Sequence, residues 1–169
     1  MRAEILKIVG FCTLASVVYG IVHDQITARI CVEYFTVFHP DVFHTTDPTL
    51  LGLGWGIIAT WWMGAFLGGA LGFACQVGKA PKIGWRKLVR QVLGVLIFMG
   101  VCAALAGKVG STVSASSLLP AVPPGASHSA FYTCLFAHNA SYFSGALGAM
   151  VLITWFMYHR FIKASPTEH

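Results

Sequence analysis

The sequence predicts an all-α protein, a bundle of four transmembrane helices with an amphipathic outer segment after the first helix. Hydrophobic residues make up 56% of the 169 residues and charged residues only 10%, whereas roughly a quarter of the residues of a soluble domain are charged. No Asp, Glu, Lys or Arg occurs from Pro48 to Gly78 or from Val109 to His159. Uncharged apolar runs of about 18 residues or more are typical of membrane spans.

Four stretches are long and apolar enough to be predicted spans. They cover about residues 5–22, 49–74, 88–107 and 139–158. Together they account for one integral membrane domain over residues 1–169, with no length left for a second domain. The last helix is expected to begin as early as Ser129, above the bilayer, and to reach Ile162. The lipid bilayer is therefore the first expected partner.

Small residues recur at every fourth position of the second predicted span. Side chains at this spacing share one face of a helix, and small ones let two backbones approach closely. We therefore expect this face to pack tightly against another helix. The residues are Gly52, Gly56, Thr60, Gly64, Gly68 and Gly72.

The basic residues behind the net charge of +5 lie where they would set the membrane topology of the chain. We therefore expect no binding to nucleic acid. With four spans, only Arg29 and Lys108 of the eleven basic residues fall on one side of the membrane. Cytoplasmic loops carry an excess of basic residues, which predicts a multi-pass cell-membrane protein with cytoplasmic N- and C-termini. The nine cytoplasmic basic residues would be Arg2, Lys7, Lys79, Lys82, Arg86, Lys87, Arg90, Arg160 and Lys163.

The segment after the first span is predicted to remain helical on the outer side, since no Gly or Pro occurs from His23 to Phe38. Gln25, Arg29 and Glu33 follow one another at every fourth position, which gives this helix a polar stripe. Arg29 and Glu33 are expected to form an ion pair; the alternative is that Arg29 binds an anionic group. The aromatic residues Tyr34, Phe35 and Phe38 are expected at the membrane interface.

Four of the six carboxylates lie between Asp24 and Asp47, so the outer side gathers the groups that could carry chemistry. The loop after Phe38 contains two histidines with an aspartate nearby in the sequence, His39 with Asp41 and His44 with Asp47. The candidate polar site as a whole comprises His23, Asp24, Arg29, Glu33, His39, His44 and His138. No catalytic residue is assigned within it.

Three of these residues, His23, Asp24 and His138, are expected at one height near the outer boundary. They are the candidate ligands for a divalent metal, since histidine and carboxylate side chains are usual zinc ligands. Adjacent helical residues point about 100° apart, which argues against His23 and Asp24 facing one ion. The alternative is purely structural: His23 and Asp24 hydrate the end of the helix and His138 bonds a loop carbonyl. Haem binding is disfavoured, because it needs histidines buried on facing helices, whereas His23 and His138 lie close to the membrane boundary.

Cys31 and Cys134 both fall on the outer side, and the sequence leaves open whether they form a disulfide. An oxidising compartment would permit the pairing. No metal-binding spacing of cysteines occurs in the chain.

The most distinctive part of the chain is the run Tyr19-Gly20-Ile21-Val22-His23-Asp24-Gln25-Ile26-Thr27-Ala28-Arg29, followed by Glu33-Tyr34-Phe35-Thr36 and His39-Pro40. With Asp47-Pro48-Thr49-Leu50-Leu51-Gly52 and Ala59-Thr60-Trp61-Trp62, it resembles a family of small, uncharacterised bacterial multispan membrane proteins. The resemblance covers about the first half of the chain. It implies the same membrane topology and singles out the outer segment, and it implies no mechanism.

Two functions are compatible with this sequence. In the first, the protein is a membrane component whose outer-face polar cap binds a partner or a lipid headgroup. In the second, the cap is a metal-dependent hydrolase that uses the His/Asp/Glu cluster at the membrane surface. Middle sections of the four spans contain no ionisable Asp, Glu, Lys, Arg or His, which disfavours an autonomous transporter. A membrane-protein partner or a homo-oligomer remains open.

Overall fold

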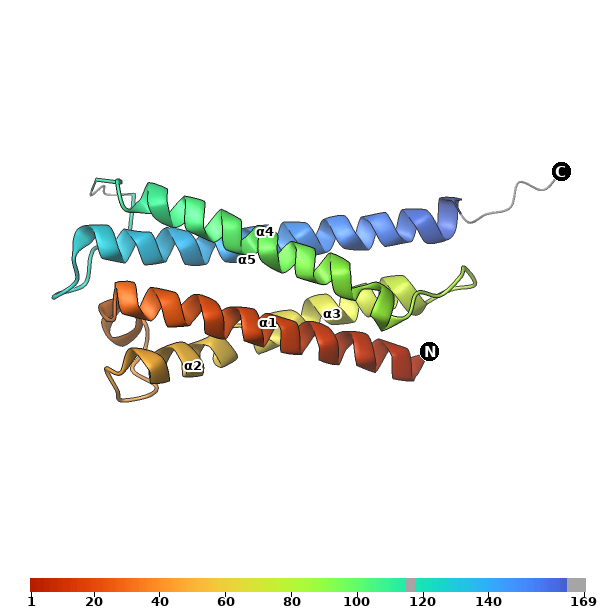
Figure 1. The fold of residues 1–169 in the computed structure, drawn as a ribbon, viewed down its shortest axis with the longest axis horizontal. Coiled ribbons are helices and arrows are strands. Elements are labelled where there is room, and N and C mark those ends of the chain that lie inside the picture. The colour runs from red at the N-terminus through yellow and green to blue at the C-terminus, as the bar shows by residue number, and fades with distance from the viewer. Residues whose placement is uncertain (115–117, 164–169) are drawn as a thin grey trace.

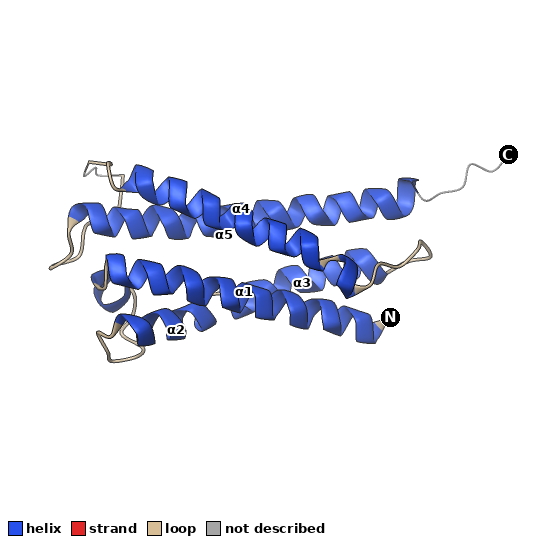
Figure 2. Cartoon of the chain, in the orientation of Figure 1, coloured by secondary structure: helices blue, strands red, loops and turns tan. Residues whose placement is uncertain are grey.

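The computed structural model describes residues 1–114 and 118–163, and this part of the chain is entirely helical apart from its loops (Figure 2). Four helical segments, 2–30, 48–76, 89–110 and 128–162, are long and apolar enough to cross a membrane, which confirms the predicted fold class. The elements in order are α1 (Arg2–Ile30), η1 (Tyr34–Phe38), α2 (Pro48–Ile58), α3 (Trp61–Gln76), η2 (Trp85–Lys87), α4 (Val89–Gly110), α5 (His128–Tyr158) and η3 (His159–Lys163).

The helices form two hairpins that lie side by side (Figure 1). In one hairpin α1 packs along α2 and α3, and in the other α4 packs along α5. The N-terminus, the 77–88 connection and the end of α5 lie at one end of the bundle, here called the basic end. Residues 31–47, 111–114 and 118–127 lie at the opposite end, here called the cap end.

The second predicted span is not one continuous helix: it is broken between α2 and α3. Asp47 caps the start of α2, where its Oδ1 accepts from the amides of Thr49 (2.8 Å) and Leu50 (2.9 Å). The helical geometry is lost at Thr60, with φ −120° and ψ −26°, and the Thr60 hydroxyl donates to the Gly56 carbonyl. This back-bonding bends helices, so the helix predicted over residues 49–74 is interrupted at Thr60, although residues 48–76 together are long and apolar enough to form one span.

The amphipathic helix predicted to run from His23 to Phe38 ends early, at Ile30. Cys31 is extended, with φ −149° and ψ 97°, and the chain then makes the single π-helical turn η1. Tyr34 and Phe35, predicted to be interfacial, are instead 4% and 2% exposed and pack against Phe131 in the core of the cap end. The packing of these two rings explains why the chain leaves the helix without a Gly or Pro.

The early end of α1 also removes the expected ion pair between Arg29 and Glu33, which are no longer one helical turn apart. The Arg29 guanidinium donates instead to Gln25, on its carbonyl (2.6 Å) and side-chain oxygen (2.7 Å), and to the Thr49 hydroxyl (2.8 Å). Arg29 therefore fixes the start of α2 against α1.

At the basic end, Arg160 holds two parts of the structure together. From the sequence, this residue is identified only as one of the basic residues that indicate the cytoplasmic side. It is only 3% exposed. Its guanidinium donates to the carbonyls of Ala74, Val77 (3.0 Å), Ala80 (3.1 Å) and Pro81 (2.7 Å). These carbonyls belong to the end of α3 and the following loop, so one side chain ties α5 to the other hairpin.

The small-residue face of α2 and α3 packs against α1, as predicted. A Cβ on Gly56 would lie 2.5 Å from the Cα and N of Ile21, and a Cβ on Gly68 would lie 2.7 Å from the Cβ of Cys12. Gly69, next in sequence, faces open space, with nothing within 4 Å of such a Cβ. Backbone-to-backbone packing of this kind is typical of membrane helix pairs.

We predict that Gly56→Ala destabilises the bundle by about 1–3 kcal/mol, because the added methyl group meets backbone atoms that cannot rotate away. The matched control, Gly69→Ala, adds the same methyl group in open space and should leave stability unchanged or slightly raised. Thermal melting of the two variants in the same detergent provides the comparison. Equal melting temperatures would show that the α1–α2 contact does not limit stability.

Candidate functional site

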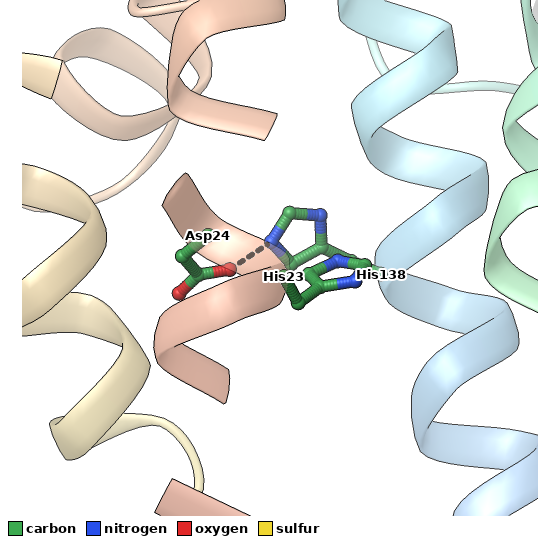
Figure 3. Close-up of side chains that lie close together, drawn as sticks. All are labelled: His23, Asp24 and His138. Atoms are coloured by element: carbon green, nitrogen blue, oxygen red, sulfur yellow. Dashed lines mark hydrogen bonds and ion pairs between the residues drawn. The ribbon is translucent and has the colours of Figure 1, made fainter. Parts of the chain in front are cut away.

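The candidate site is built on a contact between the two hairpins near the cap end. Asp24 of α1 is 4% exposed, and its Oδ1 lies 3.1 Å from Nε2 of His138 of α5 (Figure 3). The His138 side chain is itself only 13% exposed. A carboxylate and an imidazole therefore meet in an apolar interior, where each needs a partner to offset the loss of water.

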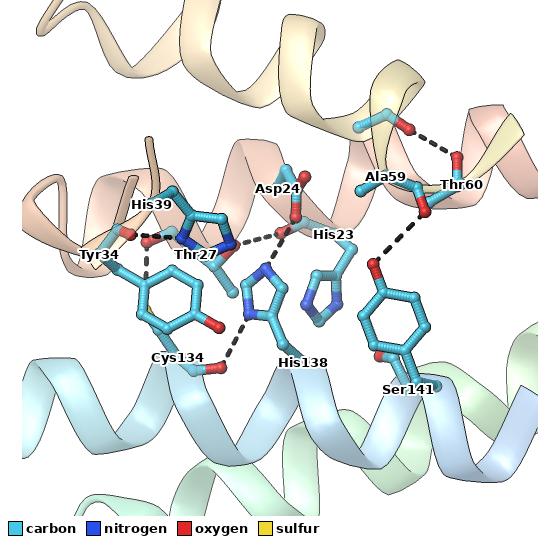
Figure 4. Close-up of polar contacts among 12 residues, drawn as sticks. His23, Asp24, Thr27, Tyr34, His39, Ala59, Thr60, Cys134, His138 and Ser141 are labelled. Carbon is cyan, nitrogen blue, oxygen red and sulfur yellow. Dashed lines mark hydrogen bonds and ion pairs between the residues drawn. The ribbon is translucent and has the colours of Figure 1, made fainter. Parts of the chain in front are cut away.

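Both ring nitrogens of His138 face oxygen atoms that accept hydrogen bonds. Nδ1 lies 2.8 Å from the carbonyl oxygen of Cys134, one turn earlier in α5, and Nε2 faces the Asp24 carboxylate (Figure 4). The carbonyl can only accept, so Nδ1 carries a proton. A neutral imidazole has one N–H, which leaves the lone pair of Nε2 directed at a carboxylate oxygen. Either a proton or a metal ion between these two atoms would turn this contact into an attractive one.

His23 completes the cluster from the other side of His138. The two rings meet edge to face with centroids 4.6 Å apart, and Tyr19 stacks on His23 at 5.8 Å. Nε2 of His23 is shielded from solvent and has no hydrogen-bond partner among the described residues. A buried nitrogen without a partner is unusual in a folded protein and calls for a ligand or a water molecule.

Potential ligand atoms of His23, Asp24 and His138 lie within 4.8 Å of one another. His23 and Asp24 are adjacent in a helix, where side chains point about 100° apart, yet each has a potential ligand atom within this distance of the other. His138 enters from α5 into the angle between His23 and Asp24, so both can reach the space beside it (Figure 3). These three side chains are also the group that the sequence placed at one height.

A cavity of about 270 Å³ adjoins the cluster on the side of the cap end, here called the cap cavity. Asp24 and His138 line it together with His39, Trp55 and Tyr142. The Trp55 indole N–H is buried and has no hydrogen-bond partner among the described residues. The cap cavity thus has on its wall a buried hydrogen-bond donor that lacks a partner among the described residues.

His39 is held at this cavity by the turn η1. Its Nδ1 donates to the Tyr34 carbonyl oxygen at 2.7 Å, which leaves Nε2 as an acceptor. Burial lowers the pKa of His39 below its ordinary value; the bond to the Tyr34 carbonyl opposes this with a smaller effect. Because its pKa is lowered, His39 is neutral at neutral pH. Burial also raises the pKa of the Tyr34 phenol.

A second cavity, of about 120 Å³, extends from the cluster toward the basic end between the hairpins and is here called the interior cavity. Its wall is mainly apolar, with Met63 and Met99 among its residues. Polar groups gather at the end near the cluster, where the Tyr19 hydroxyl and the Ser141 hydroxyl lie 2.7 Å apart. Asp24 and His138 line both cavities, and His23 lines the interior cavity.

The remaining members of the predicted polar site lie elsewhere. His44 is on an exposed loop and bonds Asp41 at 3.2 Å, whereas Asp47 caps α2 and His39 bonds the Tyr34 carbonyl. Glu33 accepts from the Cys31 thiol at 3.6 Å. Arg29, as described above, bonds Gln25 and Thr49.

Cys31 and Cys134 are both buried at the cap end and are free thiols in this structure. The Cys134 thiol donates to the Thr27 carbonyl oxygen at 3.4 Å.

The aromatic and hydroxyl residues around the cluster were not identified as part of the site from the sequence. Tyr19, Trp55 and Tyr142 carry no motif, and in a membrane protein such residues are first assigned to lipid contact or packing. The only available signal was helical spacing, because Tyr19 lies four residues before His23 and Tyr142 four residues after His138.

Comparison of the chain with protein-family models, curated proteins and solved structures found no match. The class of protein is therefore defined by the fold and the site alone: a four-helix bundle whose helices are apolar enough to span a membrane and which carries a His–Asp–His cluster with a buried Asp24.

Proposed function

We propose that this is an integral membrane protein that binds a divalent transition-metal ion through His23, Asp24 and His138, with zinc as the best fit. The observation that carries the proposal is the gathering of three potential ligands: Nε2 of His138 lies 3.1 Å from the Asp24 carboxylate while its Nδ1 is held by the Cys134 carbonyl, and the neighbouring Nε2 of His23 has no hydrogen-bond partner among the described residues. Metal-bound histidines are commonly oriented by a backbone carbonyl on the second nitrogen in this way.

The geometry fits such an ion after a small adjustment of the side chains. Zinc lies about 2.0–2.2 Å from nitrogen and oxygen ligands, so tetrahedral ligand atoms are about 3.3 Å apart. The Asp24–His138 distance of 3.1 Å already meets this, and the widest separation in the cluster is within 4.8 Å. The Nε2 of His23 would gain the partner that it lacks among the described residues.

Hydrolysis is the second candidate function, and the two cavities favour it. Three protein ligands leave the fourth position of a tetrahedral ion open for water or substrate. A bound metal would lower the pKa of that water and supply hydroxide. His39, neutral and on the wall of the cap cavity, is then a candidate proton acceptor. The hydroxide would add to an ester or amide carbonyl, and the leaving group would take the proton.

We predict that the purified protein, stripped with a chelator and dialysed against zinc, retains about one ion per chain. Asp24→Asn keeps the size and hydrogen bond of the side chain but removes the carboxylate, and should weaken zinc binding at least tenfold. His23→Phe keeps the ring contact with His138 and removes the nitrogen ligand, with the same effect.

The control is His44→Ala, which removes an exposed histidine outside the cluster and should leave zinc binding intact. Metal content by elemental analysis and melting temperature are measured on the same samples, so that loss of fold is distinguished from loss of a ligand. Zinc retention by Asp24→Asn and His23→Phe at the wild-type level would refute the site.

For the orientation of the protein we propose that the basic end is cytoplasmic and the cap end faces outward, in the cell membrane. The support is the gathering of nine of the eleven basic residues at or beside the basic end, since basic residues are retained in the cytoplasm. The metal centre would then be reached from the outer side.

We predict that a cysteine introduced at Thr45 is labelled by a membrane-impermeant maleimide in intact cells, and that one introduced at Lys82 is labelled only after permeabilisation. Both positions lie in loops at opposite ends of the bundle. The unmodified chain is the background control. Labelling of the Lys82→Cys variant in intact cells would reverse the orientation.

A further inference from the structure

A third hollow lies between α1 and α4, has a volume of about 410 Å³ and reaches the His–Asp–His cluster only at His23; it is here called the α1–α4 groove. Binding sites for small molecules commonly have volumes of about 300–1,000 Å³. The groove extends along α1 from Tyr19 to Ile30, about 17 Å at 1.5 Å per residue. This length is close to the depth of one leaflet of a hydrocarbon core about 30 Å thick.

The walls of the groove are aliphatic on one side and small on the other. On α1, Val22, Ile26 and Ile30 are 56%, 59% and 41% exposed and follow one another at every fourth position. On α4, the facing residues have little or no side chain, which hollows the surface. They are Gly100, Ala103, Ala104 and Gly107. Such a channel fits a flexible hydrocarbon chain.

The charge on the groove is positive. Lys108 is its only Asp, Glu, Lys or Arg residue, and its ammonium forms no ion pair within the described ranges. It lies near the cap-end terminus of α4, where a phospholipid headgroup would lie if that helix spans a bilayer. A cation at this level is attracted to anionic lipid.

The groove also leads to the His–Asp–His cluster, since His23 lines it. A Cβ on Gly107 would lie 3.5 Å from the Cβ of Ala137, so the neighbours Lys108 and His138 lie within about one helical turn of the same level. The part of a lipid just below its phosphate would therefore lie beside His23.

We propose that the α1–α4 groove binds one glycerophospholipid with an anionic headgroup, its phosphate at Lys108 and an acyl chain along Val22, Ile26 and Ile30. This site does not depend on the metal. It gives the cluster a membrane ligand that arrives laterally, from the bilayer, and it selects that ligand by charge.

The test is titration of metal-free protein in detergent with dioleoyl phosphatidylglycerol or dioleoyl phosphatidylcholine, with bound lipid counted by native mass spectrometry. One phosphatidylglycerol should bind at least about fivefold more tightly than phosphatidylcholine, the factor for about 1 kcal/mol per lysine. Lys108→Gln should abolish this preference, whereas Lys79→Gln, at the basic end, should preserve it.

A second pair of variants tests the groove itself. Ala104→Phe fills the groove and should remove the bound lipid, whereas Leu105→Phe places the same ring on an exposed neighbour outside the groove and should not. Melting temperatures identify any variant that fails to fold. Equal binding of the two lipids to the wild type, or equal effects of Ala104→Phe and Leu105→Phe, would overturn the proposal. Because the samples contain no metal, failure here leaves the zinc experiment unaffected.

Discussion

The interaction between Asp24 and His138 is the constraint on which this end of the molecule depends. A carboxylate that is 4% exposed in an apolar bundle is strongly unfavourable unless another group offsets its charge. The offsetting group comes from α5, in the other hairpin, so the pair fixes how the hairpins meet. Truncating either partner would leave the other buried and unpaired, which commonly costs several kcal/mol.

The close packing within the first hairpin makes this contact possible. A Cβ on Gly52 would lie 2.9 Å from the backbone carbon of Asp24, so α2 rests directly on the backbone of α1 at this level. The Asp24 side chain is accommodated on the side facing α5 (Figure 4). The turn η1 then closes over the cluster and places His39 on the wall of the cap cavity.

In the proposed function, three features of this arrangement act together. The cluster supplies one negative charge from Asp24 and two neutral imidazoles, so a divalent ion bound there retains one unit of positive charge. In an apolar setting that charge favours an anionic fourth ligand, such as hydroxide or a headgroup oxygen. The cap cavity and the α1–α4 groove both reach the cluster, one from the end of the bundle and one from its side.

Much of the fold was predictable, because membrane spans and small-residue faces depend on local composition. The long apolar runs predicted the membrane-spanning helices. The number of residues needed to cross the bilayer then predicted that His23 and His138 lie at the same height. The break at Thr60 was missed because one back-bonding hydroxyl leaves no sequence pattern, and the break at Cys31 because it depends on the packing of Tyr34 and Phe35. The sequence shows that Arg160 is charged, but its four carbonyl partners lie in the end of α3 and the loop after it, far from Arg160 in the sequence.

X-ray absorption at the zinc edge of the reconstituted protein tests the central claim most directly, because it reports the atoms bound to the metal. The proposed centre predicts two imidazole rings and oxygen ligands at about 2.0–2.2 Å, with no sulfur shell. Asp24→Asn should remove or alter this spectrum. A sulfur shell at about 2.3 Å would instead place the metal on cysteine, and would contradict the assignment to His23, Asp24 and His138.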